Sequence, residues 1–297
     1  MKKPPNKSVH PTKHTDNMKT ALSLAKRGLG NVWPNPAVGC IIVKDGQIVG
    51  RGWTQPGGRP HAEVMAIEQA GSGANGGTIY LNLEPCNHQG HSPPCTEALI
   101  AAGIKEVYAS LSDPDPRVSG GGFERLMQEK IAVYIGLLSE LAREINKGFF
   151  LRIEHGRPLI TFKTATTIDG KIATKDGKSK WITGKEARAL SHQLRSMHDA
   201  VMVGSGTALA DNPQLTSRLP GVENKGRPRI VVDGRLRLSL SSRIVLSARE
   251  SPVWLITRDD HPSEKLQSYK ENNVDLILIS PENSGGNGIN TVLQNLG

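Results

Sequence analysis

Residues 83–95 read Leu-Glu-Pro-Cys-Asn-His-Gln-Gly-His-Ser-Pro-Pro-Cys, and a His-Ala-Glu segment at 61–63 precedes them. Both cysteines follow a proline at the expected edge of an element, because Cys86 closes a strand-like run and Cys95 opens a helix-like one. His61 stands at the expected start of another helix. One imidazole and two thiolates form a ligand set that suits zinc and leaves the fourth tetrahedral position for water. We therefore predict that His61, Cys86 and Cys95 hold one zinc ion.

Glu63 lies two residues after His61, close enough to reach a water on that metal without being a ligand itself. Zinc lowers the pKa of a bound water, so that hydroxide exists near neutral pH. A carboxylate beside it can take the water's proton and pass it to a departing amino group. His-x-Glu followed by Pro-Cys is the pattern of zinc-dependent deaminases. We predict hydrolytic deamination, with Glu63 as the catalytic residue.

Two other interpretations of these residues stay open. The zinc site could be a closed structural one, with His88 or His91 as a fourth ligand, or the cysteines could be unrelated and buried. Neither interpretation gives a reason for Glu63. The third cysteine, Cys40, lies in an apolar run and is interpreted as a buried, inert thiol. Three cysteines without a secretory signal are a poor disulfide framework, so we expect a reducing, cytoplasmic location.

The composition is that of a globular protein, with 37% hydrophobic residues and no apolar run long enough for a membrane span. The formal net charge of +9 suits an anionic partner, either nucleic acid or a phosphorylated metabolite. Aromatic residues make up only 4% of the chain, whereas proteins that bind single strands interleave stacking rings with basic residues. We therefore expect neither a nucleic-acid nor a membrane partner.

Strand-like and helix-like stretches alternate along the chain, which predicts an α/β fold. In the first half, the runs at 38–43 and 48–53 flank a Lys-Asp-Gly-Gln turn, the signature of a hairpin. In the second half we expect a strand at 158–165, a helix at 185–197 and a strand at 199–206. The expected division is a disordered basic tail at 1–14, a zinc-dependent deaminase domain at 15–153 and a second α/β domain at 157–297.

The loop between the two cysteines, residues 87–94, is longer than the two-residue gap of nucleic-acid deaminases. Together with other motifs, it resembles the bifunctional riboflavin-biosynthesis deaminase–reductase family, from about Met18 to the end of the chain. The motifs that carry the resemblance are Pro34-Asn35-Pro36-Ala37-Val38-Gly39, His61-Ala62-Glu63, residues 83–95, Asp113-Pro114-Asp115-Pro116 and the glycine-rich turn at 119–122.

This resemblance implies a cytidine-deaminase-like three-layer α/β/α domain that acts on 2,5-diamino-6-ribosylamino-4(3H)-pyrimidinone 5′-phosphate. It further implies that Asn35 contacts the base and that the loop from His88 to Ser92, with His88 as a binding residue, helps to shape the substrate pocket. Thr54 stands where the family usually has a histidine, so the contact of that imidazole with the substrate is in doubt. Asp115, where the family usually has asparagine, is a milder change.

The second half resembles the family's dihydrofolate-reductase-like α/β domain, which uses NADPH to reduce the ribosyl group to ribityl. The matching runs are Lys163-Thr164-Ala165 and residues 168–171, 179–183, 194–195, 203–207 and 209–218. By this resemblance, the cofactor is lined by Ala165, Trp181, Thr207 and Asp211. The residues implied to face the substrate are Ser179, Arg195, Leu215 and Arg218. Arginines also suit a substrate phosphate on chemical grounds, because the guanidinium fork binds it bidentately.

The family pattern continues past Gly297, so we expect a truncated reductase domain with weak NADPH binding. The resemblance also implies a homo-oligomer. The alternatives are a deaminase whose second domain is inactive, a nucleic-acid deaminase, and a non-catalytic module stabilised by zinc.

Overall fold

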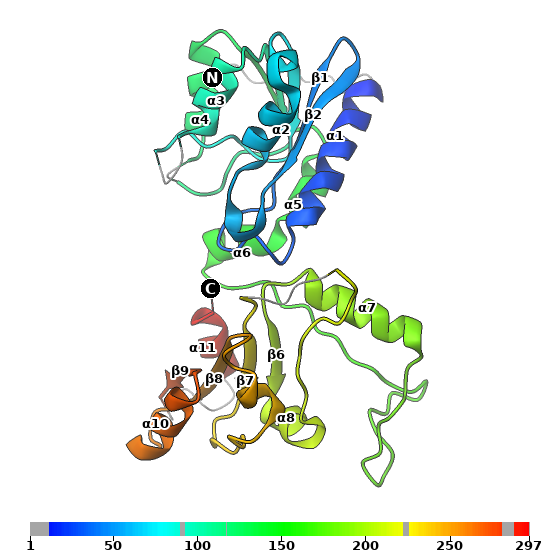
Figure 1. Ribbon diagram of the computed structural model, residues 1–297, viewed down its shortest axis with the longest axis vertical. Helices are drawn as coiled ribbons and strands as arrows, with labels where there is room; N and C mark the ends of the chain where they lie inside the picture. The colour runs from blue at the N-terminus through cyan, green and yellow to red at the C-terminus, as the bar shows by residue number, and fades with distance from the viewer. Residues whose placement is uncertain (1–11, 90–92, 117, 222–225, 281–287, 297) are drawn as a thin grey trace. The chain divides into compact units, whose positions relative to one another are not determined.

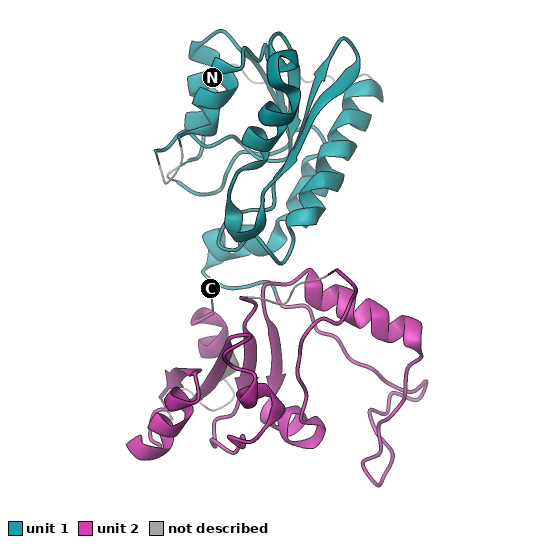
Figure 2. Ribbon diagram, in the orientation of Figure 1, with its two compact units in different colours: residues 1–159 teal, residues 160–297 magenta. Residues whose placement is uncertain are grey.

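The computed structural model describes residues 12–89, 93–116, 118–221, 226–280 and 288–296. The chain forms two compact units, residues 1–159 and 160–297, which are coloured separately in Figure 2. None of the helices in the described ranges combines the length and apolarity that a membrane crossing requires.

Unit 1 is built on a five-stranded sheet of order β2-β1-β3-β4-β5. β1 pairs antiparallel with β2 and β3, whereas β3, β4 and β5 run parallel. The hairpin predicted from residues 38–53 is confirmed as β1–β2, with Asp45 and Gly46 at positive φ in its turn. The strands are β1 (Gly39–Lys44), β2 (Gln47–Trp53), β3 (Thr78–Leu81), β4 (Glu106–Ala109) and β5 (Ala132–Ile135).

Helices cover both faces of this sheet (Figure 1). α1 (Thr12–Ala25) and α5 (Ser139–Ile145) pack on one face, where their buried residues join Ile41 and Tyr80 in one core cluster. The other face is covered by α2 (Ala62–Ala70), α3 (Cys95–Ala101) and α4 (Gly121–Gln128), over a second cluster. α6 (Lys147–His155) follows α5. The predicted three-layer α/β/α arrangement is thus confirmed.

The first helix begins within the stretch expected to be a disordered tail. Thr12 to His14 belong to α1 and not to a disordered tail that ends at residue 14, while residues 1–11 lie outside the described residues. The His14 ring explains the early start, because its Nδ1 lies 2.7 Å from the Tyr80 hydroxyl and the ring stacks on Tyr108 at 4.4 Å. These contacts fix the first turn of α1 to the sheet.

Two glycines of β2 allow α2 to lie directly on the sheet. A Cβ added to Gly52 would stand 1.9 Å from the carbonyl oxygen of Ala62, and one on Gly50 would stand 2.2 Å from that of Ala66. No side chain fits in that space. The close approach presses the first turn of α2, which carries Glu63, against the strands.

Gly52→Ala is therefore expected to destabilise unit 1 by about 3 kcal/mol, because the added methyl group meets backbone that cannot move aside. Urea unfolding followed by circular dichroism measures the change. The matched control is Gly73→Ala, whose Cβ would make only ordinary contact with Val49, at 3.7 Å, and which should cost less than about 0.5 kcal/mol. Equal midpoints for the two variants would contradict the tight packing of α2.

Two buried asparagines hold the segment before β1. Asn82 accepts a hydrogen bond from the Gly39 N–H at 2.9 Å and donates one to the Ala37 carbonyl at 3.0 Å. Asn146 accepts from the Ala37 N–H at 2.8 Å and donates to the same carbonyl at 3.0 Å. These bonds satisfy backbone groups that the sheet leaves unpaired. They also fix the neighbouring Pro34-Asn35-Pro36 turn.

Unit 2 contains a parallel four-stranded sheet of order β6-β7-β8-β9. Val231 and Leu255 lie in the core on one face of this sheet, and Ile230 and Ile256 lie on the other. The strands are β6 (Val201–Gly204), β7 (Arg229–Val232), β8 (Val253–Arg258) and β9 (Val274–Ile279). The helices are α7 (Lys185–Ser196), α8 (Ser205–Asp211), α9 (Arg243–Leu246), α10 (Ser263–Glu271) and α11 (Gly288–Gln294).

The predicted helix at 185–197 is confirmed, but two strand predictions for unit 2 need correction. The strand expected at 199–206 ends at Gly204, because α8 begins at Ser205. The strand expected at 158–165 is absent from the described residues, and Phe162 in it is 87% exposed. Its alternating apolar residues do fit a strand, but a strand also needs a hydrogen-bonding neighbour, and no described strand pairs with this segment.

Candidate active site

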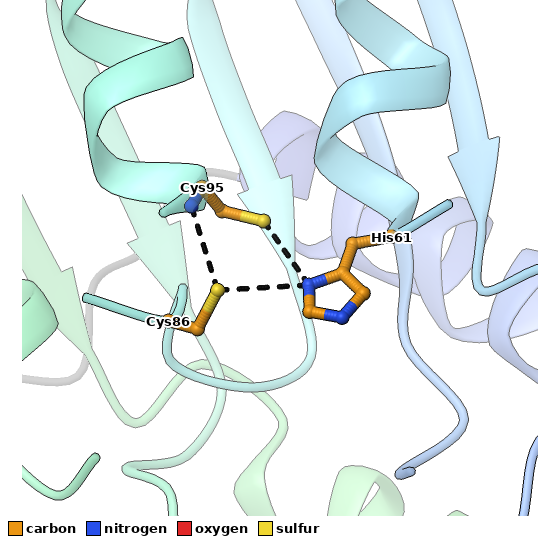
Figure 3. A group of neighbouring side chains, drawn as sticks. All are labelled: His61, Cys86 and Cys95. Atoms are coloured by element: carbon orange, nitrogen blue, oxygen red, sulfur yellow. Dashed lines mark hydrogen bonds between the residues drawn. The ribbon is translucent and has the colours of Figure 1, made fainter. Parts of the chain in front are cut away.

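His61, Cys86 and Cys95 meet in unit 1 beside the first turns of two helices (Figure 3). His61 is the residue immediately before α2, Cys95 is the first residue of α3, and Cys86 lies in the loop that follows β3. The backbone N–H of Thr96 donates to the Cys86 carbonyl at 3.2 Å. The Thr96 hydroxyl donates to the Asn87 side chain at 2.8 Å. These bonds hold the cysteine loop against the start of α3.

The geometry of the three side chains fits a tetrahedral zinc ion. Nδ1 of His61 lies 3.2 Å from the Cys95 sulfur and 3.6 Å from the Cys86 sulfur. Bond lengths of about 2.3 Å to sulfur and about 2.1 Å to nitrogen place tetrahedral ligand atoms roughly 3.6 Å apart. The three ligand atoms all lie within 4.8 Å of one another. One ion can therefore reach all three with small adjustments.

The electrostatics of the site favour a thiolate at Cys86. The pKa of Cys86 is lowered well below its usual range, chiefly because the Cys95 side chain and His61 hydrogen-bond to its sulfur. The pKa of His61 is raised by the same bond to Cys86. Zinc binds the deprotonated forms of both residue types. The ligand set therefore starts with one thiolate already stabilised.

Glu63 is buried, with 3% of its surface exposed, on the first turn of α2. Burial raises the pKa of its carboxyl group, against the opposing effect of the neighbouring His61. Cys86 adds to the rise in this pKa and a hydrogen bond with the Cys95 side chain opposes it, so the carboxyl group lies beside the ligand cluster. A carboxyl group with a raised pKa can accept a proton near neutral pH and give it up again.

A cavity of about 270 Å³ opens beside the cluster, a volume near the lower limit for small-molecule sites. Asn35 and His88, which the family resemblance implies in substrate binding, both line it, whereas His91 lies outside the described residues. The remaining lining residues are Pro34, Pro36, Val38, Thr54, Arg59, His61, Glu63, Leu83, Glu84, Cys86, Asp113, Asp115, Val118, Phe149 and Arg152.

Gly58 and Thr54 pack tightly against the segment that contains Asn35. A Cβ on Gly58, where φ is +84°, would stand 1.8 Å from the Asn35 amide nitrogen, so only glycine leaves that amide its place. Thr54 is buried, and its hydroxyl accepts from the Val38 N–H at 2.9 Å and donates to the Pro36 carbonyl at 3.2 Å. The Thr54 hydroxyl is therefore engaged with the backbone.

One wall of the cavity is organised by Glu84, which sequence reasoning did not single out. Its buried carboxylate accepts backbone hydrogen bonds from Asp113 at 3.3 Å, Gly120 at 3.0 Å, Gly122 at 2.9 Å and Phe123 at 3.4 Å. These four bonds compensate for burying the charge. They also fix the loop that presents Asp113 and Asp115 to the cavity.

Burial raises the pKa of Asp113 from 3.8 to about 6, with its carboxylate neighbours Asp115 and Glu84 adding to the effect. Because the folded-state pKa is raised, this group's stabilisation is complete below pH 3.8 and is lost as the pH rises through about 6. Asp113→Asn does not ionise and its amide oxygen can still accept from Asp115. We expect this variant to be more stable than the wild type by about 1–2 kcal/mol above pH 6.

Urea unfolding at about pH 4.5, 6 and 7.5 tests this expectation. The stability difference should grow up to about pH 6 and then stay constant. Asp45→Asn, in the exposed hairpin turn, is the control for removing a carboxylate from the surface. A difference for Asp113→Asn that does not change with pH would show that ionising Asp113 costs nothing in the folded chain.

The chain is similar to known families and proteins over most of its length. Residues 11–111 match the cytidine and deoxycytidylate deaminase zinc-binding region, and residues 158–296 match the RibD C-terminal domain. The chain is 47% identical over 262 residues to the riboflavin biosynthesis protein RibD of Aquifex aeolicus, covering 88% of this chain and 72% of that protein. The chain belongs to the RibD family. Identity to RibD of Escherichia coli is 41% over 291 residues, covering 94% of this chain and 77% of that protein.

Solved RibD structures agree with this assignment. A diaminohydroxyphosphoribosylaminopyrimidine deaminase/5-amino-6-(5-phosphoribosylamino)uracil reductase from Thermotoga maritima superposes with a TM-score of 0.84 at 37% identity, covering 97% of this chain and 78% of that one. RibD from Acinetobacter baumannii gives a TM-score of 0.83, also at 37% identity, covering 96% and 77%. This RibD chain is therefore a bifunctional deaminase and reductase of riboflavin biosynthesis. The predicted order of a cytidine-deaminase-like domain and a reductase domain is confirmed.

The residues implied for the reductase step all lie in unit 2. Arg195 of α7 donates to the Thr216 carbonyl at 3.1 Å, and buried Leu215 lines a small cavity with it. The other implied residues are not brought into one cluster by the described contacts. Trp181 is 71% exposed under the Arg188 guanidinium. Ala165 and Ser179 are partly exposed, and Thr207 and Asp211 are exposed.

His192 is a residue of unit 2 that sequence reasoning missed. Its Nδ1 accepts from the backbone N–H of Arg218 at 3.2 Å, so the neutral ring carries its proton on Nε2. Nη2 of Arg218 lies 3.3 Å from that Nε2, which brings two donors together. An oxyanion placed between them would accept from both. His192 and Arg195 are three residues apart and so lie on one face of α7. This spacing was the signal by which the sequence could have indicated His192 as a neighbour of Arg195.

Proposed function

We propose that the deaminase step of this RibD chain uses His61, Cys86 and Cys95 as zinc ligands and Glu63 as the proton carrier. The observation that carries the proposal is the cluster of three ligand atoms within 4.8 Å, with the buried Glu63 beside it. When bound there, zinc supplies a Lewis acid that makes an attacking water more acidic. Glu63 takes a proton from this water and delivers it to the amino group that leaves the pyrimidine ring as ammonia.

The proposed substrate is 2,5-diamino-6-ribosylamino-4(3H)-pyrimidinone 5′-phosphate. Its base enters the 270 Å³ cavity, where the Asn35 amide and His88 provide hydrogen-bonding groups. Asn35 offers both a donor and an acceptor, which suits the edge of a pyrimidine. Thr54 adds no contact to the base, because its hydroxyl is already bonded to the backbone.

For the reductase step, we propose NADPH as the hydride donor that converts the ribosyl group to ribityl. Its binding residues are proposed to be Ala165, Trp181, Thr207 and Asp211. Ser179, Arg195, Leu215 and Arg218 are proposed to face the substrate. The paired donors of His192 and Arg218 support an anion on this side, since a phosphate accepts from both.

We propose a cytoplasmic homo-oligomer that acts on a phosphorylated small molecule and not on nucleic acid. Free cysteines at all three positions suit a reducing compartment. The long loop between the cysteines opposes a nucleic-acid substrate.

The experiment that tests this function incubates the purified chain with the ribosylaminopyrimidine phosphate and NADPH, and identifies the product by mass spectrometry. A deaminated product that carries ribityl supports both steps. A deaminated product that retains ribose limits the active part to unit 1. Unchanged substrate from a zinc-loaded chain would overturn the substrate proposal. Deamination of RNA or single-stranded DNA would favour the alternative of a nucleic-acid deaminase.

A further inference from the structure

The walls of the deaminase cavity carry an uneven distribution of charge. Among the described residues that line it, Arg59 and Arg152 alone are permanently cationic. The carboxylates on the same walls are Glu63, Glu84, Asp113 and Asp115. A phosphate on the substrate is repelled by the carboxylates, so among the described lining residues the two arginines are the groups suited to determine its position.

Arg152 extends from α6, an element that supplies no metal ligand. Its Nη2 donates to the carbonyl oxygen of Pro34 at 2.9 Å, and its guanidinium lies 5.7 Å from the centre of the Phe149 ring. These contacts hold the guanidinium on the cavity wall beside the Asn35 turn. One donor is used by Pro34, and the other four can bind an anion.

Arg143, in helix α5, differs from Arg152 because its charge is neutralised by an ion pair. Its Nη2 lies 2.7 and 2.9 Å from the two carboxylate oxygens of Glu154, and it does not line the cavity. By contrast, no carboxylate of the described residues lies within ion-pair distance of Arg152. The charge of Arg152 is therefore held in place without a paired carboxylate from that part of the chain.

Arg59 is less suited to the phosphate because it lies two residues before His61, at the reacting end of the cavity. In the substrate, the ribose separates the phosphate from the ring that loses its amino group. A phosphate anchor must therefore stand away from the metal ligands, on an element such as α6.

We propose that Arg152 binds the 5′-phosphate of the substrate during the deamination step, and so makes this step selective for the phosphorylated compound. The proposal rests on the proposed function of unit 1. The guanidinium fork matches two phosphate oxygens, while its bond to Pro34 couples phosphate binding to the turn that carries Asn35. Arg152 is thus a specificity-determining residue that makes no contact with the reacting atoms.

The test compares ammonia release from the phosphorylated substrate and from the same compound after phosphatase treatment. Three zinc-loaded chains are assayed: the wild type, Arg152→Ala and the matched control Arg143→Ala. Arg152→Ala should lower kcat/KM for the phosphorylated substrate about tenfold, mainly through KM, because a charge-assisted phosphate contact is lost. It should leave kcat/KM for the dephosphorylated compound within about twofold of the wild type. Arg143→Ala should change neither value.

The possible outcomes separate the phosphate anchor from other roles of Arg152. An equal loss on both substrates would overturn the proposal, because Arg152 would then act only by supporting the Pro34 turn. No loss on either substrate would place the phosphate elsewhere and overturn it as well. Partial rescue by Arg152→Lys for the phosphorylated substrate alone would support it. A wild-type chain that released no ammonia from either compound would overturn the proposed function itself, and the anchor with it.

Discussion

Glu63→Gln is expected to lower kcat for deamination about 10³-fold while the chain still binds zinc. General acid–base groups contribute about 10²- to 10⁴-fold, and in the proposed mechanism this one carboxyl group serves both the attacking water and the leaving amine. Glutamine has nearly the same shape and forms hydrogen bonds, but it does not take up or release a proton at neutral pH. The loss should therefore appear in kcat, because the residues that line the cavity are unchanged.

Three measurements on each variant separate chemistry from damage to the fold: ammonia release, zinc content by elemental analysis, and the reductase rate on the deaminated intermediate. Glu63→Gln should change only the first. Glu68→Gln, at an exposed position of the same helix, is the control and should change none. Near-normal turnover by Glu63→Gln would show that another group moves the proton.

The zinc cluster could be proposed from sequence because its residues are chemically distinctive and stand at recognisable element edges. Cysteine is rare in this chain, and two of its three cysteines follow prolines at the ends of expected elements. The structure adds the distances between the side chains, and their roles as ligands stay predictions. The hairpin and the α/β class could be predicted for a related reason, since alternation and turn residues are local signals. The three-layer arrangement was implied by the family resemblance.

The cavity wall that Glu84 organises could not be predicted because it depends on contacts between distant parts of the chain. Nothing in the residues around Glu84 indicates that its carboxylate accepts from backbone at 113–123. Sequence also treats Arg143 and Arg152 alike, as charges on helices. Only the fold shows that Arg143 is paired with Glu154 and that Arg152 faces a cavity.

The segment at 158–165 shows the opposite limit, where a local signal exists and the structure does not follow it. Its alternating apolar residues predict a strand, and Ile160 and Phe162 are nevertheless exposed. A strand forms only when its backbone groups find partners, and this is decided outside the segment. Local pattern therefore indicates which segments can form strands, whereas pairing decides which of them do.

Cys86→Ala is expected to abolish zinc binding and deamination together. Loss of one of three protein ligands leaves His61 and Cys95, which hold the metal at least about 100-fold more weakly, since even the loss of an outer-shell partner costs 10- to 100-fold. Cys86 is also the sulfur that its neighbours stabilise as a thiolate, because its pKa is lowered by Cys95 and His61. Its removal takes away the stabilised negative charge that attracts the cation.

The control for Cys86→Ala is Cys40→Ala, which removes a fully buried thiol of the same unit that is not part of the ligand cluster. Cys40→Ala is expected to lose stability through the small cavity it leaves, yet to retain zinc and deamination. Added zinc should raise the Tm of the wild type and of Cys40→Ala, because a ligand stabilises the state that binds it. It should leave the Tm of Cys86→Ala unchanged. If Cys86→Ala retained a full zinc complement, His88 or another group would have to take its place, and the proposed ligand set would be wrong.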